Sequence, residues 1–268
     1  MFMIFYKINK SHKAIILLIL FNNSNLWYYY YRENEGKCFM KIKIKEIIKF
    51  ILIFLLYLFY SDIIVTIITK VGIDLKVLPT TSKIILMMLI NLSLMIMLFI
   101  FYRKSIKENF KDFKSNFKTY IKDNFKYYVI GLLVMIISNI IISFFVEGNS
   151  TNETLIREYI SIMPIYMIFS SCIYAPFAEE MVFRKSLRNC FNNKVLYILL
   201  SGLIFGSMHL LSASSIVELV FLVPYSALGC AFAYMYSKTD NIFVPMSFHM
   251  MHNTIIVLNY ILVFVIGG

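Results

Sequence analysis

Residues 50–69 read FILIFLLYLFYSDIIVTIIT, an apolar run in which Asp62 is the only charged side chain. A helix needs about 20 consecutive apolar residues to cross the hydrocarbon core of a bilayer. The whole chain has the same character, since 60% of its 268 residues are hydrophobic and only 15% are charged. Soluble domains carry about a quarter charged residues. The chain is therefore predicted to be an integral membrane protein.

Further apolar runs follow this one, and turn or charged segments separate them. Inside a bilayer the backbone must satisfy its own hydrogen bonds, which favours helices over isolated strands. The fold is therefore predicted to be all-α, a polytopic transmembrane helix bundle of about seven spans in the cell membrane. The expected spans are about 50–69, 84–102, 127–146, 159–191, 195–212, 215–236 and 243–266.

The formal net charge of +11 would suggest a nucleic-acid partner in a soluble protein. Here the positions of the charges indicate topology instead, because Lys and Arg collect in cytoplasmic loops. Residues 103–126 carry eight Lys or Arg against three acids, whereas 147–158 carry three Glu and one Arg. We therefore predict no nucleic-acid partner and a cytoplasmic N-terminus. The 103–126 loop and the 192–194 turn are placed in the cytoplasm, and the C-terminus outside.

The loop 103–126 has a pattern of its own, with apolar residues three and four positions apart and lysines between them. This spacing predicts an amphipathic helix on the anionic cytoplasmic leaflet, in contact with membrane lipids. A solvated linker of low complexity is the alternative. The apolar positions are Phe110, Phe113, Phe117, Tyr120 and Ile121, and the cationic ones Lys111, Lys114, Lys118 and Lys122.

The apolar run at 14–21 is too short to span a bilayer. Met40 opens a basic flank directly before the first span. We hypothesise that Met40 is the native start and that residues 1–39 are an N-terminal extension. Residues 40–158 would then form an N-terminal transmembrane part, and 159–268 the core that carries the chemistry.

Residues 176–184 read PFAEEMVFR and place two carboxylates and a guanidinium among apolar residues. An unpaired ionised group at mid-bilayer costs at least a few kcal/mol, so pairing is expected. Glu180 and Arg184 are four residues apart, on one helix face and in the favoured order. Glu179 points about 100° away from Glu180 on an α-helix, which leaves it free for a reaction.

Two further polar positions fall at the depth of Glu179. Folding the chain back at Asn193 puts Glu179 and His209 within about 3 Å in depth, at 1.5 Å per residue. A turn near Thr239 brings His249 to an overlapping level. Polar groups at the same membrane depth on three helices indicate a functional site more often than a purely structural role. The predicted catalytic cluster is Glu179, His209, His249 and Asn253, with Glu180 and Arg184 behind it.

Such a cluster can hydrolyse an amide in two ways. Glu179 could take a proton from an attacking water while His and Asn side chains stabilise the oxyanion. Alternatively, Glu179, His209 and His249 could hold a divalent metal such as zinc, because two imidazoles and a carboxylate form a catalytic zinc set. The sequence does not decide between the metal-free and the metal-dependent mechanism.

Three ordered motifs across about 165–258 resemble those of the CAAX-protease and bacteriocin-processing (CPBP, or Abi) family of intramembrane proteases. The family carries E-E-x-x-x-R, F-x-x-x-H and H-x-x-x-N on separate helices. One departure is Lys185, where a Gly is common. The motifs stand here as Glu179-Glu180…Arg184, Phe205…His209 and His249…Asn253.

The resemblance implies a helical membrane endopeptidase in which Glu179 activates water and His209, His249 and Asn253 assist it. It implies a peptide or lipidated-protein substrate, through CAAX-type C-terminal processing or bacteriocin-related processing. Many members are called metalloendopeptidases, although a metal-free mechanism is also proposed for the family. The oligomeric state and the substrate are left open.

Two other functions fit the same residues. The first is a non-catalytic membrane protein for bacteriocin self-immunity, in which the cluster serves binding or folding. The second is a transporter or proton relay, since chains of Asp, Glu and His also line such paths. The sequence lacks the internal repeat that transporters show, which disfavours the second.

Overall fold

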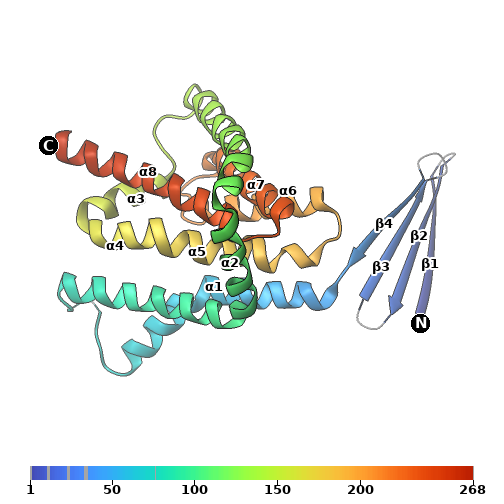
Figure 1. The fold of residues 1–268 in the computed structure, drawn as a ribbon, viewed down its shortest axis with the longest axis horizontal. Coiled ribbons are helices and arrows are strands. Elements are labelled where there is room, and N and C mark those ends of the chain that lie inside the picture. The colour runs from blue at the N-terminus through green and yellow to red at the C-terminus, as the bar shows by residue number, and fades with distance from the viewer. Residues whose placement is uncertain (1, 11–12, 23–24, 33–35, 76, 268) are drawn as a thin grey trace.

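The computed structural model describes residues 2–10, 13–22, 25–32, 36–75 and 77–267. From residue 44 onward its regular elements are helices, and this part confirms the predicted helical membrane bundle (Figure 1). The elements are α1 (Ile44–Lys70), α2 (Thr80–Ser143), α3 (Thr151–Ile162), α4 (Pro164–Phe169), η1 (Ser170–Tyr174), α5 (Ala175–Glu179), η2 (Glu180–Ser186), η3 (Arg188–Cys190), α6 (Lys194–Met208), η4 (Ile216–Phe221), α7 (Leu222–Thr239) and α8 (Phe243–Gly267).

Among the described residues, four helical stretches are long and apolar enough to cross a membrane. They are α1, α2, η4 with α7, and α8, and α6 is a shorter apolar helix. The 64-residue α2 contains two of the predicted spans together with the basic segment between them. The predicted span 159–191 is wrong in its bounds, because the chain breaks at Met163 between α3 and α4 and then alternates between α- and π-helical turns.

The described residues between 2 and 42 form an antiparallel sheet in the order β1-β2-β3-β4, which was not predicted from the sequence. The strands contain apolar runs that are too short to span a bilayer. Hydrophobic periodicity alone does not distinguish a strand from a helix in runs of this length. The strands are β1 (Phe2–Lys10), β2 (Lys13–Asn22), β3 (Asn25–Arg32) and β4 (Gly36–Ile42). Met40 lies within β4, opposite Tyr28 of β3, and the hypothesis of a native start at Met40 stays a prediction.

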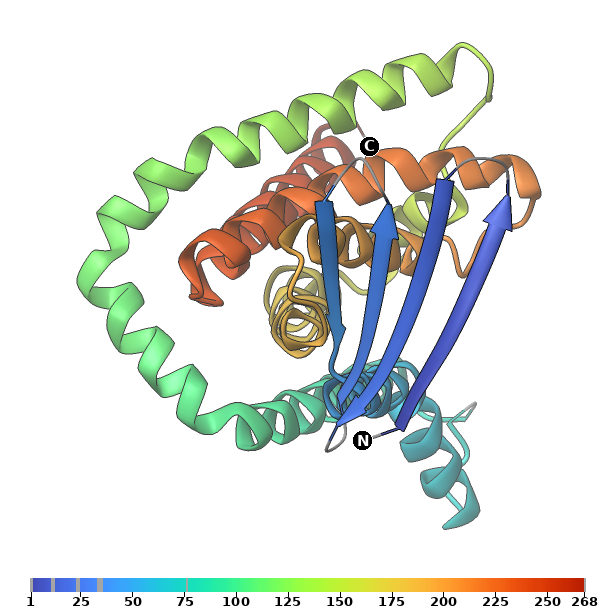
Figure 2. The ribbon, with the colours of Figure 1, turned by 90° about the vertical axis from the view of Figure 1, so that its right-hand side faces the viewer.

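Helix α2 bends around the bundle, and its two apolar arms pass on opposite sides of the other helices (Figure 2). The bend has a local cause at Asn116, the one residue of α2 with non-helical backbone angles (φ −114°, ψ 16°). The Asn116 amide donates to Asp112 O over 3.2 Å and to Asp112 Oδ1 over 2.8 Å. Such back-bonding to the preceding turn competes with the helical ladder and bends helices.

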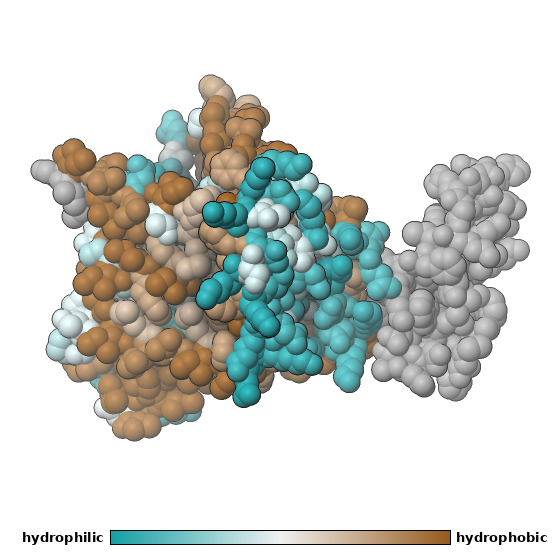
Figure 3. Space-filling view, viewed as in Figure 1, coloured by the Kyte–Doolittle hydropathy of each residue, from teal (hydrophilic) through white to brown (hydrophobic). Residues whose placement is uncertain are grey.

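The basic middle of α2 lies across one end of the bundle, where Figure 3 shows a hydrophilic band beside the apolar surface. It is held on the turn between α7 and α8. Nδ2 of Asn241 donates to Asn109 O over 2.8 Å and to Asp112 Oδ2 over 2.7 Å. Oδ1 of Asn109 accepts the backbone N–H of Ile242 over 3.1 Å.

The 103–126 segment is helical as predicted, but its apolar face does not lie only on lipid. Phe113, Tyr120 and Ile121 pack against a buried cluster of the bundle. Phe110 and Phe117 remain half exposed, beside exposed lysines. One part of the apolar face of this segment therefore packs on the bundle. The spacing of apolar residues along one helix does not distinguish a face that packs on protein from a face that contacts lipid.

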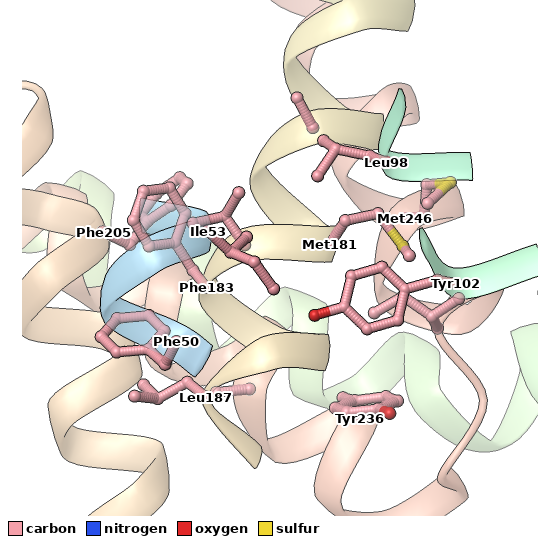
Figure 4. Close-up of a cluster of buried hydrophobic side chains, with 14 of the residues drawn as sticks. Phe50, Ile53, Leu98, Tyr102, Met181, Phe183, Leu187, Phe205, Tyr236 and Met246 are labelled. Atoms are coloured by element: carbon pink, nitrogen blue, oxygen red, sulfur yellow. The ribbon is translucent and has the colours of Figure 1, made fainter. Parts of the chain in front are cut away.

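Residues 181–187 run through the centre of the bundle. Met181, Phe183 and Leu187 are at most 2% exposed and meet side chains from five other helices (Figure 4). This packing fixes the preceding carboxylates in the middle of the protein. The surrounding residues are Phe50 and Ile53 of α1, Leu98 and Tyr102 of α2, Phe205 of α6, Tyr236 of α7 and Met246 of α8.

Candidate active site

The segment that carries the two glutamates is wound partly as π-helix, and a proline leaves one of its carbonyls open. The N–H of Ala175 bonds Ser170 O, five residues back. The next bond in this register would come from residue 176, but Pro176 has no N–H. Instead, Nδ2 of Asn253 donates to Ser171 O over 2.8 Å. One N–H of the Asn253 amide is thus used to tie α8 to η1.

Both carboxylates converge on one imidazole. Nδ1 of His249 lies 2.9 Å from Oε1 of Glu180, and its Nε2 lies 3.7 Å from Oε2 of Glu179. The prediction that Glu180 pairs with Arg184 and leaves Glu179 free for a reaction assumed a regular α-helix. In the structure η2 begins at Glu180, and both carboxylates reach His249. A π-turn is wider than an α-turn and is frequent at functional sites.

The predicted pair of Glu180 and Arg184 is present, with Nη1 of Arg184 3.3 Å from Oε1 of Glu180 and both side chains 0% exposed. Nη2 of Arg184 donates to Gly229 O over 3.2 Å. The guanidinium also lies 4.4 Å from the ring centroid of Phe205, a cation–π contact. A buried charge is tolerated where it is paired in this way, so Glu180 is compensated inside the protein.

The two carboxylates lie at opposite ring nitrogens of His249. Nδ1 is within hydrogen-bond distance of Glu180, and Nε2 faces Glu179. The imidazole ring of His249 stacks on the ring of Phe232, with centroids 5.0 Å apart and planes inclined by 24°. His249 is therefore held between the two carboxylates with its ring plane fixed.

His209 caps the C-terminus of α6 and reaches the same region from another side. Its ring stacks on Tyr225, with centroids 4.6 Å apart, and meets the edge of Phe205 at 4.9 Å. The ring of His249 contacts Phe205 at 5.7 Å. The two imidazoles thus share Phe205, although no described hydrogen bond joins His209 to Glu179 or His249.

All four predicted catalytic residues line one cavity of about 560 Å³. The walls come from α1, the second arm of α2, α3 to α6, η4, α7 and α8, so sequence-distant helices build it together. His252, which is not part of the predicted catalytic cluster, also lines the cavity, and its Nδ1 lies 3.2 Å from the hydroxyl of Tyr128.

A model of the Rce1-like family, described as type II CAAX prenyl endopeptidase, matches residues 161–255. This segment contains every motif residue named above. We call residues 161–255 the Rce1-like domain, after the family model that they match. The resemblance to the CAAX-protease and bacteriocin-processing family is thereby confirmed for this part of the chain.

A curated relative of the chain is the "Putative membrane peptidase YdiL" of Bacillus subtilis (strain 168), which is 34% identical over 123 residues. The aligned part covers 44% of this chain and 47% of the relative. The chain therefore matches about half the length of this relative. No solved structure matches the chain.

Several cavity-lining residues lie outside the Rce1-like domain, and Tyr57 is the one among them that contacts Glu179. Tyr57 of α1 lines the cavity and donates a hydrogen bond from its hydroxyl to Oε1 of Glu179 over 3.3 Å. No sequence signal marked it, because a tyrosine in an apolar run resembles an ordinary packing residue.

The metal-dependent route would require Glu179, His209 and His249 to converge on one ion. Among the described residues, no group of three or more His, Cys, Asp or Glu side chains is arranged to hold a metal ion. Nε2 of His249 faces Glu179, but no described contact brings His209 to either residue. In this arrangement Glu179, His209 and His249 do not form a three-ligand zinc centre.

Proposed function

We propose that the chain is an intramembrane protease that hydrolyses a peptide bond with a water activated by Glu179. One observation carries this proposal: the two neighbouring carboxylates differ in access. Glu179 lines the cavity, whereas Glu180 is 0% exposed and compensated by Arg184. One acid can therefore reach a substrate while the other holds the site together.

In this mechanism a water attacks the substrate carbonyl and gives its proton to Glu179. Nε2 of His249 lies 3.7 Å from Oε2 of Glu179, so the imidazole can share or relay that proton. The resulting tetrahedral oxyanion needs hydrogen-bond donors, and His209 and the second N–H of Asn253 line the same cavity. When the C–N bond breaks, the Glu179 carboxyl returns the proton to the leaving amine, which regenerates the carboxylate.

The site lies within apolar helices, which favours a substrate that enters from the membrane, such as a lipidated protein or a membrane-anchored peptide. CAAX-type C-terminal processing and bacteriocin-related processing are the two candidate reactions. We place the N-terminus in the cytoplasm, because the basic middle of α2 and the start of α1 lie at one end of the bundle. Lys49 of α1 lies 5.6 Å from the ring centroid of Tyr102 there.

The test uses the full chain in isolated membranes and in proteoliposomes, with Glu179→Gln as the variant. Glu158→Gln is the matched control, since Glu158 is an exposed carboxylate that does not line the cavity. The probes are a farnesylated C-terminal peptide, a set of transmembrane peptides, and the membrane proteome read for new chain termini. We expect cleavage by the wild type and Glu158→Gln, and none by Glu179→Gln. Undiminished cleavage by Glu179→Gln would end the proposal.

The same variants separate two remaining alternatives. For the non-catalytic immunity function, protection from a bacteriocin would survive the loss of Glu179 and His209. For the zinc-dependent route, the purified protein would hold stoichiometric zinc and lose it on replacement of His209 or His249, because these imidazoles would be metal ligands.

A further inference from the structure

His209 differs from His249 in what holds its ring. Nδ1 of His249 is within hydrogen-bond distance of Glu180. For His209 the described side-chain contacts are aromatic, since its ring stacks on Tyr225 and meets the edge of Phe205. No hydrogen bond from either ring nitrogen of His209 is among the described contacts. Both nitrogens therefore stay available to a substrate in the cavity that His209 lines.

The stacking partner decides how the imidazole of His209 is oriented. Helix α6 ends at Met208, and the chain continues from His209 as a turn, so no following helical turn supports the ring. The centroids of the His209 and Tyr225 rings lie 4.6 Å apart, and their planes are inclined by 22°. In such a stack the ring nitrogens lie at the edge, where they can still bond a ligand.

Tyr225 is held in turn by its hydroxyl group. This oxygen lies 2.7 Å from Oγ of Ser150 and accepts from Nδ2 of Asn152 over 3.3 Å. Ser150 is the N-cap of α3 and is 1% exposed, and its Oγ also accepts the N–H of Glu153 over 3.2 Å. Breaking such bonds leaves buried polar groups without partners, which costs about 1–3 kcal/mol each. The first turn of α3 thus fixes the Tyr225 side chain.

The same turn of α3 is fastened at a second point. Glu218 of η4 accepts the N–H of Thr151 over 2.8 Å and the hydroxyl of Thr151 over 2.7 Å. It also accepts the N–H of Ser214 over 2.9 Å. Hydrogen bonds to a carboxylate are stronger than those between neutral groups. Because η4 leads directly into α7, which carries Tyr225, the turn and the tyrosine are held as one unit.

We propose that Tyr225 is a positioning residue for His209, and that the first turn of α3, residues 150–153, keeps Tyr225 in place. The chain of contacts runs from Ser150 through the hydroxyl and ring of Tyr225 to the imidazole, which is then presented to the oxyanion with its nitrogens free. The proposal rests on the proposed protease function. It makes a segment outside the Rce1-like domain a support of the reaction centre, where a shift of about 1 Å can cost a hundredfold in rate.

The kinetic experiment uses the full chain in proteoliposomes and one peptide found in the cleavage assay. Tyr225→Phe keeps the stacked ring and removes its bonds to α3, and Ser150→Ala removes one of these bonds from the other side. Each should lower kcat about fivefold and leave KM nearly unchanged, because a group that acts on the oxyanion contributes in the transition state. Tyr234→Phe is the control, since Tyr234 lies on the same helix, is 38% exposed and does not line the cavity.

The same substitution in a His209→Gln background separates positioning from general packing. If Tyr225 acts through His209, Tyr225→Phe should lower the remaining activity of His209→Gln no further, since the two effects are then not additive. Tyr225→Phe also leaves the N-cap bond of Ser150 in place, so it stays decisive if Ser150→Ala loosens α3 as a whole. Melting temperatures in detergent check that each variant is folded.

A second measurement does not depend on activity. The chain has four histidines, so histidine labelled with 13C at Cε1 gives four NMR signals. The signals of His209 and His249 are those lost in His209→Gln and His249→Gln. Tyr225→Leu, which removes the stacked ring, and Ser150→Ala should both shift the His209 signal and leave the His249 signal in place. Tyr234→Phe should shift neither.

The outcomes distinguish a failure of this proposal from a failure of the protease function. Wild-type kinetics in Tyr225→Phe, or an equal loss with and without His209, overturns the positioning role of Tyr225. A His209 signal that stays in place in Tyr225→Leu also overturns it, and this result decides if His209→Gln has no measurable activity. An unshifted signal in Ser150→Ala overturns the role of α3. If Glu179→Gln cleaves as the wild type does, the protease function itself fails.

Discussion

The hydroxyl of Tyr57 donates to Oε1 of Glu179 over 3.3 Å, and these two residues lie 122 positions apart in the chain. The tyrosine ring is held edge-on against Phe183, with centroids 5.7 Å apart and planes at 83°. One oxygen of Glu179 thus faces Tyr57 and the other faces His249. Helix α1, outside the Rce1-like domain, completes the surroundings of the proposed base.

Replacing Tyr57 with Phe should lower kcat about tenfold and change KM little, because the ring packing stays and only the bond that orients Glu179 is lost. Steady-state kinetics in proteoliposomes measures both constants. Tyr60→Phe is the control, since Tyr60 lies on the same helix but its hydroxyl bonds Ser93 at 2.7 Å. Equal kcat for wild type and Tyr57→Phe would contradict the positioning role.

Arg184→Met should destabilise the protein by about 3–5 kcal/mol, because it leaves Glu180 charged and buried without its partner. The double variant Glu180→Gln/Arg184→Met should recover part of this loss, since it removes both charges. Thermal unfolding in detergent, read by circular dichroism, compares the variants. A double variant less stable than Arg184→Met alone would show that charge compensation is not the main role of the pair.

Gly202→Ala should destabilise the packing of α6 on α7 by about 1–3 kcal/mol. A Cβ atom at Gly202 would lie 2.9 Å from the backbone N of Cys230 and 3.0 Å from Ser226 O. These are backbone atoms and cannot move aside easily. Because His209 ends α6, cleavage activity should fall as well. Ser207→Ala on the exposed side of the same helix is the control, and similar melting temperatures for the two variants would refute the close-packing argument.

The attachment of α2 to the turn between α7 and α8 should weaken in acid through Asp112. The hydrogen bond from Tyr120 contributes most to lowering the pKa of the Asp112 carboxyl, and the hydrogen bond from Asn241 contributes next. A lowered folded-state pKa contributes stability above the unfolded value of about 3.9, and that stability is lost as the pH falls through the folded pKa.

The hydrogen-exchange protection factors of residues 109–121, corrected for the intrinsic rate at each pH, should therefore be high at neutral pH and fall below about pH 4. Asp112→Asn should exchange faster at neutral pH and respond less to acid, since its amide does not titrate. Asp123→Asn, an exposed acid on the same helix, is the control. An acid response that is identical in wild type and Asp112→Asn would exclude this carboxylate as the cause.

Local features of the chain already determined the membrane bundle and the candidate residues. The lengths of the apolar runs predicted helices in a bilayer, because a bilayer imposes one minimum length and one way to satisfy the backbone. The pairing of Glu180 with Arg184 followed from a spacing of four residues. The matched depths of Glu179, His209 and His249 followed from the rise per residue of a helix.

Only the tertiary structure decided how those residues face one another. The π-helical turns at Glu180 bring both carboxylates to His249, and Pro176 leaves Ser171 O for the Asn253 amide. Tyr57 reaches Glu179 from a helix that carries no motif. Such contacts depend on which helix faces pack together and on where a helix departs from regular geometry. Neither is encoded in the spacing of residues along a single helix, so the sequence supplied the acids and imidazoles, and the packing of α1, η2 and α8 gave them their partners.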